Sequence, residues 1–270
     1  MKKTVAILGA GNMGLAITDG ILASEELGFC DIILVRRSVE KLSEYKDRGC
    51  TVTCDAVQAS EQAEVLILAV KPQMMQELLS TIAPVCRGKL VISIAAGVKI
   101  ESIESMLPNC KVVRAMPNTP LTVGAGVTEL CRGASVSDED FAFAKKLFEC
   151  SGACVECSEK DINAFTALTS SAVAYFAAVE EAMCKWAEKN GLSHFDRQTL
   201  CDLISKTQEG TAKLLYEKKM PPAELIRAVA SPKGTTERAL LVFEEQDLEG
   251  IFDNAMTACL KRADELSRIK

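Results

Sequence analysis

The sequence contains little of what many catalytic sites are built from. His194 is the single histidine among 270 residues, and Phe, Trp and Tyr together make up 5% of the chain. A single histidine is too little for a zinc site or for a mechanism in which imidazole is the acid and base, so we expect no metal. A basic stripe is also missing. The formal net charge is −6 and the isoelectric point is near 5.1, which argues against a nucleic-acid partner.

Long apolar runs are missing as well. Uninterrupted apolar stretches stay below 18 residues, so we expect no membrane span. The start, MKKTVAILGAGNMG, sets two lysines before an apolar run, but that run is too short for a secretion signal and ends in Gly-Asn. These features favour a cytoplasmic protein.

Cysteine, by contrast, is plentiful, with twelve residues in the chain. Without an export signal we expect reduced, mostly buried thiols rather than a disulfide framework.

Cys150, Cys154 and Cys157 have the spacing C-x3-C-x2-C, which also holds the iron–sulfur cluster of radical enzymes that use S-adenosylmethionine. The alternative is a short strand through ACVEC, on which Cys154 and Cys157 point to opposite faces and cannot share a cluster. We favour the strand.

The chain divides into two regions that differ in composition. Residues 1–160 hold 12 of the 16 glycines and alternate short β-branched runs with amphipathic segments, which predicts βαβ units and a doubly wound, mostly parallel sheet. Residues 161–270 are poor in glycine and predict an all-helical region, with helices at about 222–230, 235–245 and 248–269. The stretch VAYFAAVEEAMCKWA is apolar on more than one face, so we expect a homodimer buried through these helices.

A glycine fingerprint joins the first strand to the first helix. Gly9, Gly11 and Gly14 have the spacing G-x-G-x-x-G within the first fifteen residues. This pattern is typical of a Rossmann domain, where the turn and the helix N-terminus hold a dinucleotide pyrophosphate. The predicted contacts are Gly9, Ala10, Gly11, Asn12, Met13 and Gly14.

The end of the second strand indicates which dinucleotide is used. The sequence there is LVRRSVEKL, with Arg36, Arg37 and Ser38 where an NAD-preferring site carries a carboxylate. Two guanidinium groups suit a 2′-phosphate, so we expect NADPH, with NADH accepted at lower efficiency. A solvated basic turn is the alternative.

Several further stretches resemble one family. LAVKPQ (68–73), SIAAGV (93–98), VVRAMPNTP (112–120), VGAGVT (123–128) and SPKGTT (231–236), together with GAGNMG, are similar to Δ1-pyrroline-5-carboxylate reductases almost end to end. The resemblance implies an N-terminal Rossmann domain, a helical C-terminal domain for dimerisation and substrate binding, and NAD(P)H-dependent reduction of a cyclic imino acid in the final step of proline biosynthesis. It also implies intertwined dimers, sometimes assembled into larger rings.

Matched by position, the resemblance adds site residues to the fingerprint. The further cofactor contacts are Ala69, Val70, Lys71, Pro72, Ala95, Ala96 and Asn118. The substrate contacts are Glu159, Ser231, Lys233, Gly234, Thr235 and Thr236, with Thr236 able to donate the proton. Three of these have structural alternatives: Lys71 as a surface cap, Asn118 as a turn former, and Glu159 as a solvated glutamate at a helix start.

The residues of SPKGTT (231–236) are chemically suited to bind the substrate. A helix beginning there leaves backbone N–H groups open, which makes a carboxylate site, with Ser231 or Thr235 as possible caps and Pro232 stiffening the entry. An imine needs no separate electrophile, so positioning against the nicotinamide supplies most of the catalysis. Lys233 either adds charge or points outward.

Two departures from the family's usual sequence leave the identity of the substrate open. The family's usual GSGPAY is SSAVAY here, and its SPGGTT is SPKGTT, with Lys233 in place of a glycine. A reductase acting on a different cyclic imino acid is therefore one alternative. A non-catalytic NADPH-binding regulatory protein of the same fold is another.

Overall fold

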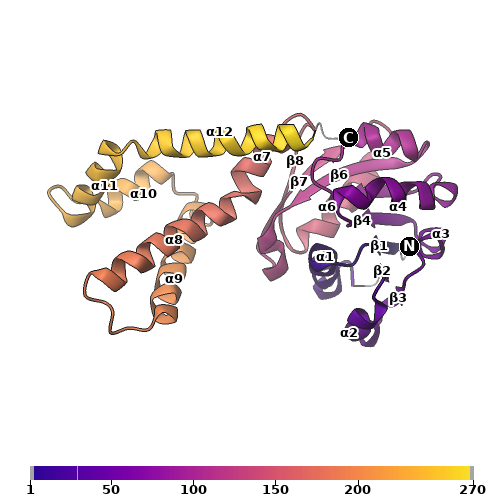
Figure 1. The fold of residues 1–270 in the computed structure, drawn as a ribbon, viewed down its shortest axis with the longest axis horizontal. Coiled ribbons are helices and arrows are strands. Elements are labelled where there is room, and N and C mark those ends of the chain that lie inside the picture. The colour runs from indigo at the N-terminus through magenta and orange to yellow at the C-terminus, as the bar shows by residue number, and fades with distance from the viewer. Residues whose placement is uncertain (1–2, 29, 268–270) are drawn as a thin grey trace. The chain divides into compact units, whose positions relative to one another are not determined.

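The computed structural model describes residues 3–28 and 30–267. These residues form two compact units (Figure 1). The first comprises the described residues up to Ser171 together with 259–267, and the second comprises Ala172–Ala258. Residues 259–267 are tied to the rest of the first unit by a hydrogen bond of 2.8 Å from Asn163 Nδ2 to Asp264 Oδ1.

The first unit is built on one eight-stranded sheet of order β3-β2-β1-β4-β5-β6-β7-β8. Its strands are β1 (Thr4–Leu8), β2 (Asp31–Val35), β3 (Thr51–Thr53), β4 (Val65–Leu68), β5 (Leu90–Ser93), β6 (Lys111–Pro117), β7 (Gly126–Arg132) and β8 (Gly152–Glu156). All neighbouring strands pair in parallel except β6 and β7. The predicted mostly parallel sheet is confirmed.

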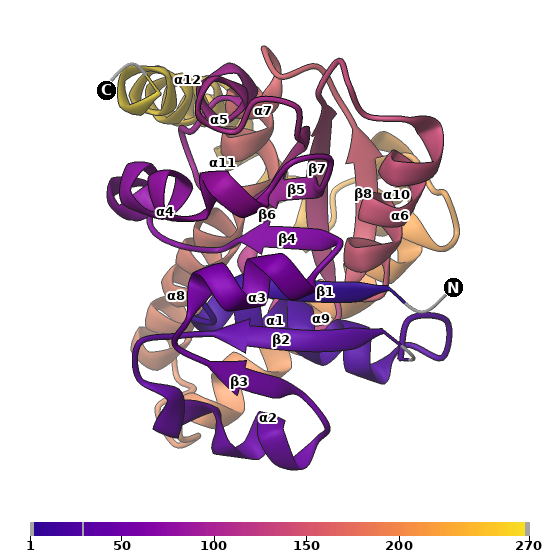
Figure 2. The same ribbon diagram turned by 90° about the vertical axis from the view of Figure 1, so that its right-hand side faces the viewer.

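Helices cover both faces of this sheet (Figure 2). One apolar cluster packs α1 (Asn12–Ala23), α2 (Ser43–Asp47) and α6 (Asp138–Glu149) against the sheet. The other packs α3 (Ala56–Gln62), α4 (Met75–Ile82), α5 (Ile100–Met106) and α7 (Ile162–Phe165). Central strands buried on both faces explain the unbroken apolar runs in the sequence, such as VAIL and VLIL.

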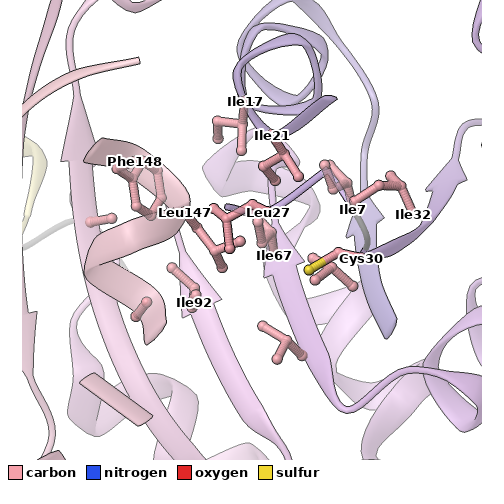
Figure 3. Close-up of a cluster of buried hydrophobic side chains, with 14 of the residues drawn as sticks. Ile7, Ile17, Ile21, Leu27, Cys30, Ile32, Ile67, Ile92, Leu147 and Phe148 are labelled. Atoms are coloured by element: carbon pink, nitrogen blue, oxygen red, sulfur yellow. The ribbon is translucent and has the colours of Figure 1, made fainter. Parts of the chain in front are cut away.

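Figure 3 shows part of the first cluster, where isoleucines from neighbouring strands meet side chains of α1 and α6. The labelled members are Ile7, Ile17, Ile21, Leu27, Cys30, Ile32, Ile67, Ile92, Leu147 and Phe148. Cys154 packs against this cluster and Cys157 against the other, so the two thiols lie on opposite faces as the strand through ACVEC predicts.

The second unit is helical. It contains α8 (Ala172–Lys189), α9 (Arg197–Tyr216), α10 (Pro222–Val229), α11 (Thr235–Glu245) and the first part of α12 (Leu248–Leu266). The predicted helices at 222–230 and 235–245 are confirmed to within one residue. The predicted end of the last helix at Ile269 lies outside the described residues.

This unit buries little of its own apolar surface. Its core cluster within the described residues consists of Cys184, Ala187 and Leu200, with Cys201 and Ile204 packed against it. Large apolar side chains on α8 remain exposed at helical spacing, namely Phe176, Val179, Met183 and Trp186. Residues 162–189 are also long and apolar enough, by length and composition, to cross a membrane.

Candidate active site

The glycine turn after β1 packs directly on the stretch after β4. Gly9 has φ +99°, and a Cβ atom there would lie 2.7 Å from Val70 Cγ1 and 2.9 Å from the carbonyl carbon of Ala69. Only glycine fits this position, because both the backbone angle and the neighbouring atoms exclude a side chain. The structure thus brings two predicted cofactor segments, GAGNMG and LAVKP, into contact at the carboxyl edge of the sheet.

The start of α1 presents open hydrogen-bond donors. Gly11 is the N-cap, and the backbone N–H groups of Asn12, Met13 and Gly14 have no acceptor among the described residues. The first turn carries no acidic side chain, so the positive end of the helix dipole is not neutralised. A phosphate group fits such a helix end.

The two arginines after β2 are not equivalent. Arg36 is half-buried, and its Nη1 donates to the carbonyl oxygen of Ala10 at 3.2 Å, which ties the strand end to the glycine turn. Arg37 is exposed, and its guanidinium has no partner among the described residues. Ser38 follows as the N-cap of a short 3₁₀ helix. The guanidinium free to meet a 2′-phosphate is therefore that of Arg37.

The ends of β4 and β5 border the same edge. Lys71 is exposed and caps the 3₁₀ helix that begins at Pro72, so its side chain is free while its backbone shapes the turn. Ala95 is buried in the second apolar cluster, whereas Ala96 is exposed. A ligand at this edge meets the side chain of Ala96 and only the backbone of Ala95.

Asn118 is buried, and both ends of its amide are engaged. Its Oδ1 accepts the backbone N–H of Val127 at 2.9 Å, and its Nδ2 donates to the carbonyl oxygen of Thr169 at 3.4 Å. These contacts hold the end of β6 against β7 and against the turn before α8. Both polar atoms of the Asn118 side chain are therefore engaged within the protein.

Glu159 is also engaged with the protein. Its Oε1 accepts the backbone N–H of Ile100 at 2.8 Å and Nη1 of Arg114 at 3.1 Å. The first contact holds the start of α5, and the second neutralises the buried guanidinium of Arg114. Its other oxygen, Oε2, has no partner within the described residues, so one lone-pair face remains open.

Three further polar residues lie near Asn118 and Glu159 but were not predicted from the sequence: Arg114 of β6, Glu129 of β7, and Thr169, which follows α7. Glu129 is fully buried in β7, where Thr169 Oγ1 lies 2.8 Å from its Oε1, and its Oε2 has no hydrogen-bond partner within the described part of the chain. Burial raises the pKa of the Glu129 carboxyl above its ordinary value. The sequence did contain a signal, because Arg114 and Glu129 are ionisable residues within the mainly apolar strand patterns VVRAM and VTELC.

The second unit carries the other predicted segment, Ser231–Thr236. The N-cap of α11 is Gly234 and no side chain caps it, so the expectation that Ser231 or Thr235 fills this role is wrong. A Cβ atom at Gly234 would lie 2.5 Å from Ser231 Oγ, which explains the glycine. The backbone N–H groups of Thr235, Thr236 and Glu237 have no acceptor among the described residues. The expected open helix end is present.

Lys233 adopts a left-handed backbone conformation, with φ +61°. Its backbone N–H donates to Glu237 Oε2 at 2.7 Å, and its side chain is exposed. A left-handed residue at this point is the conformation that glycine adopts without strain. The backbone thus explains why a glycine is usual here in the family that the sequence resembles.

Thr236 lines an apolar cavity of about 360 Å³ within the second unit. The other lining residues are Thr211, Leu214, Leu215, Pro222, Leu225, Ile226, Val229 and Leu240. Thr236 is less exposed than Thr235, which faces solvent. The Thr236 hydroxyl therefore belongs to a wall that is apolar except for Thr236 and Thr211.

Comparison with known proteins gives two family matches. Residues 159–266 match the family described as pyrroline-5-carboxylate reductase dimerisation, and residues 4–97 match NADP oxidoreductase, coenzyme F420-dependent. The two matches fall on the helical region and on the glycine-fingerprint region.

Whole-chain relatives agree with these matches. The pyrroline-5-carboxylate reductase of Corynebacterium melassecola is 35% identical, over 98% of this chain and 99% of the relative. That of Escherichia coli is 33% identical, over 99% and 100%. A solved pyrroline-5-carboxylate reductase from Coxiella burnetii has a TM-score of 0.92 at 33% identity, covering 99% of this chain and 100% of the other. The Plasmodium falciparum enzyme, solved with NADP bound, has a TM-score of 0.84 at 25% identity, covering 98% of each chain.

The resemblance predicted from the motifs is thus confirmed over the full length of the sequence. The chain belongs to the pyrroline-5-carboxylate reductase family.

Proposed function

We propose that this protein reduces Δ1-pyrroline-5-carboxylate to L-proline by hydride transfer from NADPH to the imine carbon. The observation that carries the proposal is the glycine turn followed by Arg37 just after β2: among the described residues, three N–H groups of that turn have no acceptor and the Arg37 guanidinium has no partner. This arrangement occurs in a chain that matches named reductases from end to end.

The residues of the first unit fit the cofactor. The open N–H groups at the start of α1 would hold the pyrophosphate, and Arg37 would hold the 2′-phosphate. The turns after β4 and β5 would flank the nicotinamide, through Val70, Lys71 and Ala96. NADPH, once bound there, supplies the hydride.

The residues of the second unit fit the substrate. The open N–H groups of Thr235 and Thr236 would receive the carboxylate, and the Thr236 hydroxyl would contact the ring nitrogen, which gains a proton as the imine is reduced. Gly234 permits the close approach of the carboxylate. We assign no charge contact to Lys233, because its side chain is exposed and forms no ion pair with the described residues.

The domain roles follow from this division. We propose that residues 1–160 bind NADP and that residues 161–270 provide dimerisation and substrate contacts. A second copy of the chain would cover the exposed apolar side chains of α8, and the match of residues 159–266 to a dimerisation family supports this. A partner surface accounts for the apolar stretch 162–189 without a membrane.

A steady-state assay of NADPH oxidation with a panel of cyclic imines tests the proposal. We expect the highest kcat/KM with the five-membered imino acid Δ1-pyrroline-5-carboxylate. A higher kcat/KM with a six-membered or substituted imino acid would identify a different reductase. NADPH binding without turnover of any imine would indicate a regulatory protein.

A further inference from the structure

Two thiols of the second unit lie close together. Cys184 Sγ of α8 and Cys201 Sγ of α9 are 3.0 Å apart. A covalent S–S bond is about 2.05 Å long, so closing one here needs a movement of only about 1 Å. Cys184 is fully buried and Cys201 is half-buried, so a small reagent reaches the pair through Cys201.

Polar contacts on both sides of the thiols fix the two helices relative to each other. On one side, Arg197 of α9 forms ion pairs with Glu181 and Glu188 of α8. On the other side, Ser205 Oγ donates to the carboxylate of Glu180, with oxygen distances of 2.9 and 3.0 Å. Because Arg197, Cys201 and Ser205 are four residues apart, they lie on one face of α9. The thiols are thus held in register by their neighbours.

We propose that Cys184 and Cys201 form a reversible redox site, which a peroxide closes to an intramolecular disulfide. The Cys201 thiolate attacks a peroxide oxygen, so an S–O bond forms and the O–O bond breaks, giving a sulfenic acid and hydroxide. The sulfur of Cys184 then attacks the sulfenic sulfur, the S–S bond forms, and the sulfenic oxygen leaves as water with the proton of Cys184. Two thiols are oxidised, and one hydrogen peroxide is reduced to two waters.

The environment of the two thiols favours Cys201 as the thiol that reacts first and Cys184 as the thiol that reacts second. The hydrogen bond with Cys201, followed by burial, raises the pKa of the Cys184 thiol to about 11, which keeps Cys184 protonated until the second step. A second thiol pair, Cys131 and Cys157, has its Sγ atoms 3.5 Å apart, and burial raises the pKa of both thiols. Cys131 and Cys157 therefore serve as a comparison pair of close thiols within the same protein.

Peptide mapping of the full-length protein tests the proposal. The protein is treated with hydrogen peroxide, its remaining thiols are blocked with an alkylating reagent, and it is digested with trypsin. Cleavage at Lys160, Lys185, Arg197 and Lys206 places the two thiols in separate peptides, 161–185 and 198–206, each with one cysteine. We expect these two peptides joined, with the loss of two hydrogens, and separated again by dithiothreitol.

Substitutions and thermal unfolding sharpen the test. Cys184→Ser and Cys201→Ser should each abolish the joined peptides, and the matched variant Cys131→Ser should retain them. Because the new bond closes a loop between residues 17 apart, peroxide should raise the Tm of the wild type by about 5–10 °C, but not that of Cys201→Ser. Peptides that remain separate and alkylated in the wild type, or that join to other cysteines instead, would overturn the proposal.

Discussion

Thr169 Oγ1 lies 2.8 Å from Glu129 Oε1 and 2.7 Å from the carbonyl oxygen of Phe165. A hydroxyl carries one proton, so Thr169 cannot donate to both acceptors. Both contacts are hydrogen bonds only if Thr169 donates to Phe165 and Glu129 donates to Thr169. Glu129 is fully buried, and burial raises the pKa of its carboxyl. The hydrogen-bond geometry around Thr169 and the burial of Glu129 both favour a neutral carboxylic acid at Glu129.

This arrangement predicts a pH dependence of stability. Because the folded-state pKa of Glu129 is raised above the ordinary 4.5, the native state retains a proton that the unfolded state loses. The contribution of Glu129 to stability is fully present below pH 4.5 and is lost as the pH rises through the folded-state pKa. Glu129→Gln should therefore gain stability relative to the wild type across this window, with a slope of up to about 1.4 kcal/mol per pH unit.

Urea unfolding at a series of pH values from 4 upward measures the effect. Glu139→Gln, which removes the same charge from an exposed position on α6, serves as the control and should run parallel to the wild type. Parallel curves for Glu129→Gln and the wild type would contradict a protonated Glu129.

Cofactor preference should depend on Arg37 more than on Arg36. Arg37 is exposed and its guanidinium has no partner among the described residues, so Arg37→Ala would remove the proposed phosphate contact alone. We expect a loss of about 1.5–3 kcal/mol in the preference for NADPH over NADH, roughly 10- to 100-fold in the ratio of the two kcat/KM values. Arg36→Ala should impair both cofactors, because Arg36 also holds the carbonyl of Ala10. Equal kcat/KM for the two cofactors in the wild type would refute this preference.

Lys233 should matter for the backbone and not for the substrate. Its φ of +61° is strained for any residue with a Cβ atom, and Lys233→Gly relieves that strain. Glycine also gives the unfolded chain more freedom, so the net gain in unfolding free energy should be about 0.5–1 kcal/mol. The KM for the imino acid should not change, since the lysine side chain is exposed. A raised KM in Lys233→Gly would show instead that the ammonium group holds the carboxylate.

The sequence predicted the elements of the fold but not how its polar residues pair. Periodicity and glycine placement predicted the sheet, and the opposite orientation of Cys154 and Cys157 followed from strand geometry. The partners of Glu159 could not be predicted in this way, because Ile100 and Arg114 lie 59 and 45 residues away along the chain. The cap of α11 was mispredicted because Ser and Thr usually outrank glycine at that position, whereas here Ser231 leaves no room for a side chain.

Dimerisation should depend on the exposed apolar stripe of α8. Phe176 is 63% exposed, and it lines up with Val179, Met183 and Trp186 on one face of the helix. Phe176→Glu would bury a charge in a dimer interface and should shift the protein to monomer or unfold the helical region. Lys189→Glu, an exposed change on the same helix, should leave the dimer intact. Sedimentation at low micromolar concentration without detergent distinguishes these outcomes, and a stable, folded wild-type monomer would rule out the obligate dimer.

The substrate assignment turns on the hydroxyl of Thr236. If the carboxylate binds mainly to backbone N–H groups, Thr235→Ala should have a mild effect, because its exposed side chain adds little to that contact. Thr236→Ala should lower kcat/KM for the imino acid by roughly tenfold or more, which corresponds to a loss of about 1.4 kcal/mol, the size of one hydrogen bond to a charged or developing group.

Two further variants separate the hydroxyl from packing in the apolar cavity. Thr236→Val keeps the shape of the side chain and should be as impaired as Thr236→Ala, whereas Thr236→Ser keeps the hydroxyl and should retain most of the activity. NADPH affinity should stay the same in all of them, because the proposed cofactor residues Gly9–Gly14 belong to the other unit. A Thr236→Val enzyme with unchanged kinetics on every accepted imine would remove Thr236 from the site. A loss of NADPH binding would show that the substitution acts through the structure as a whole and not through the substrate.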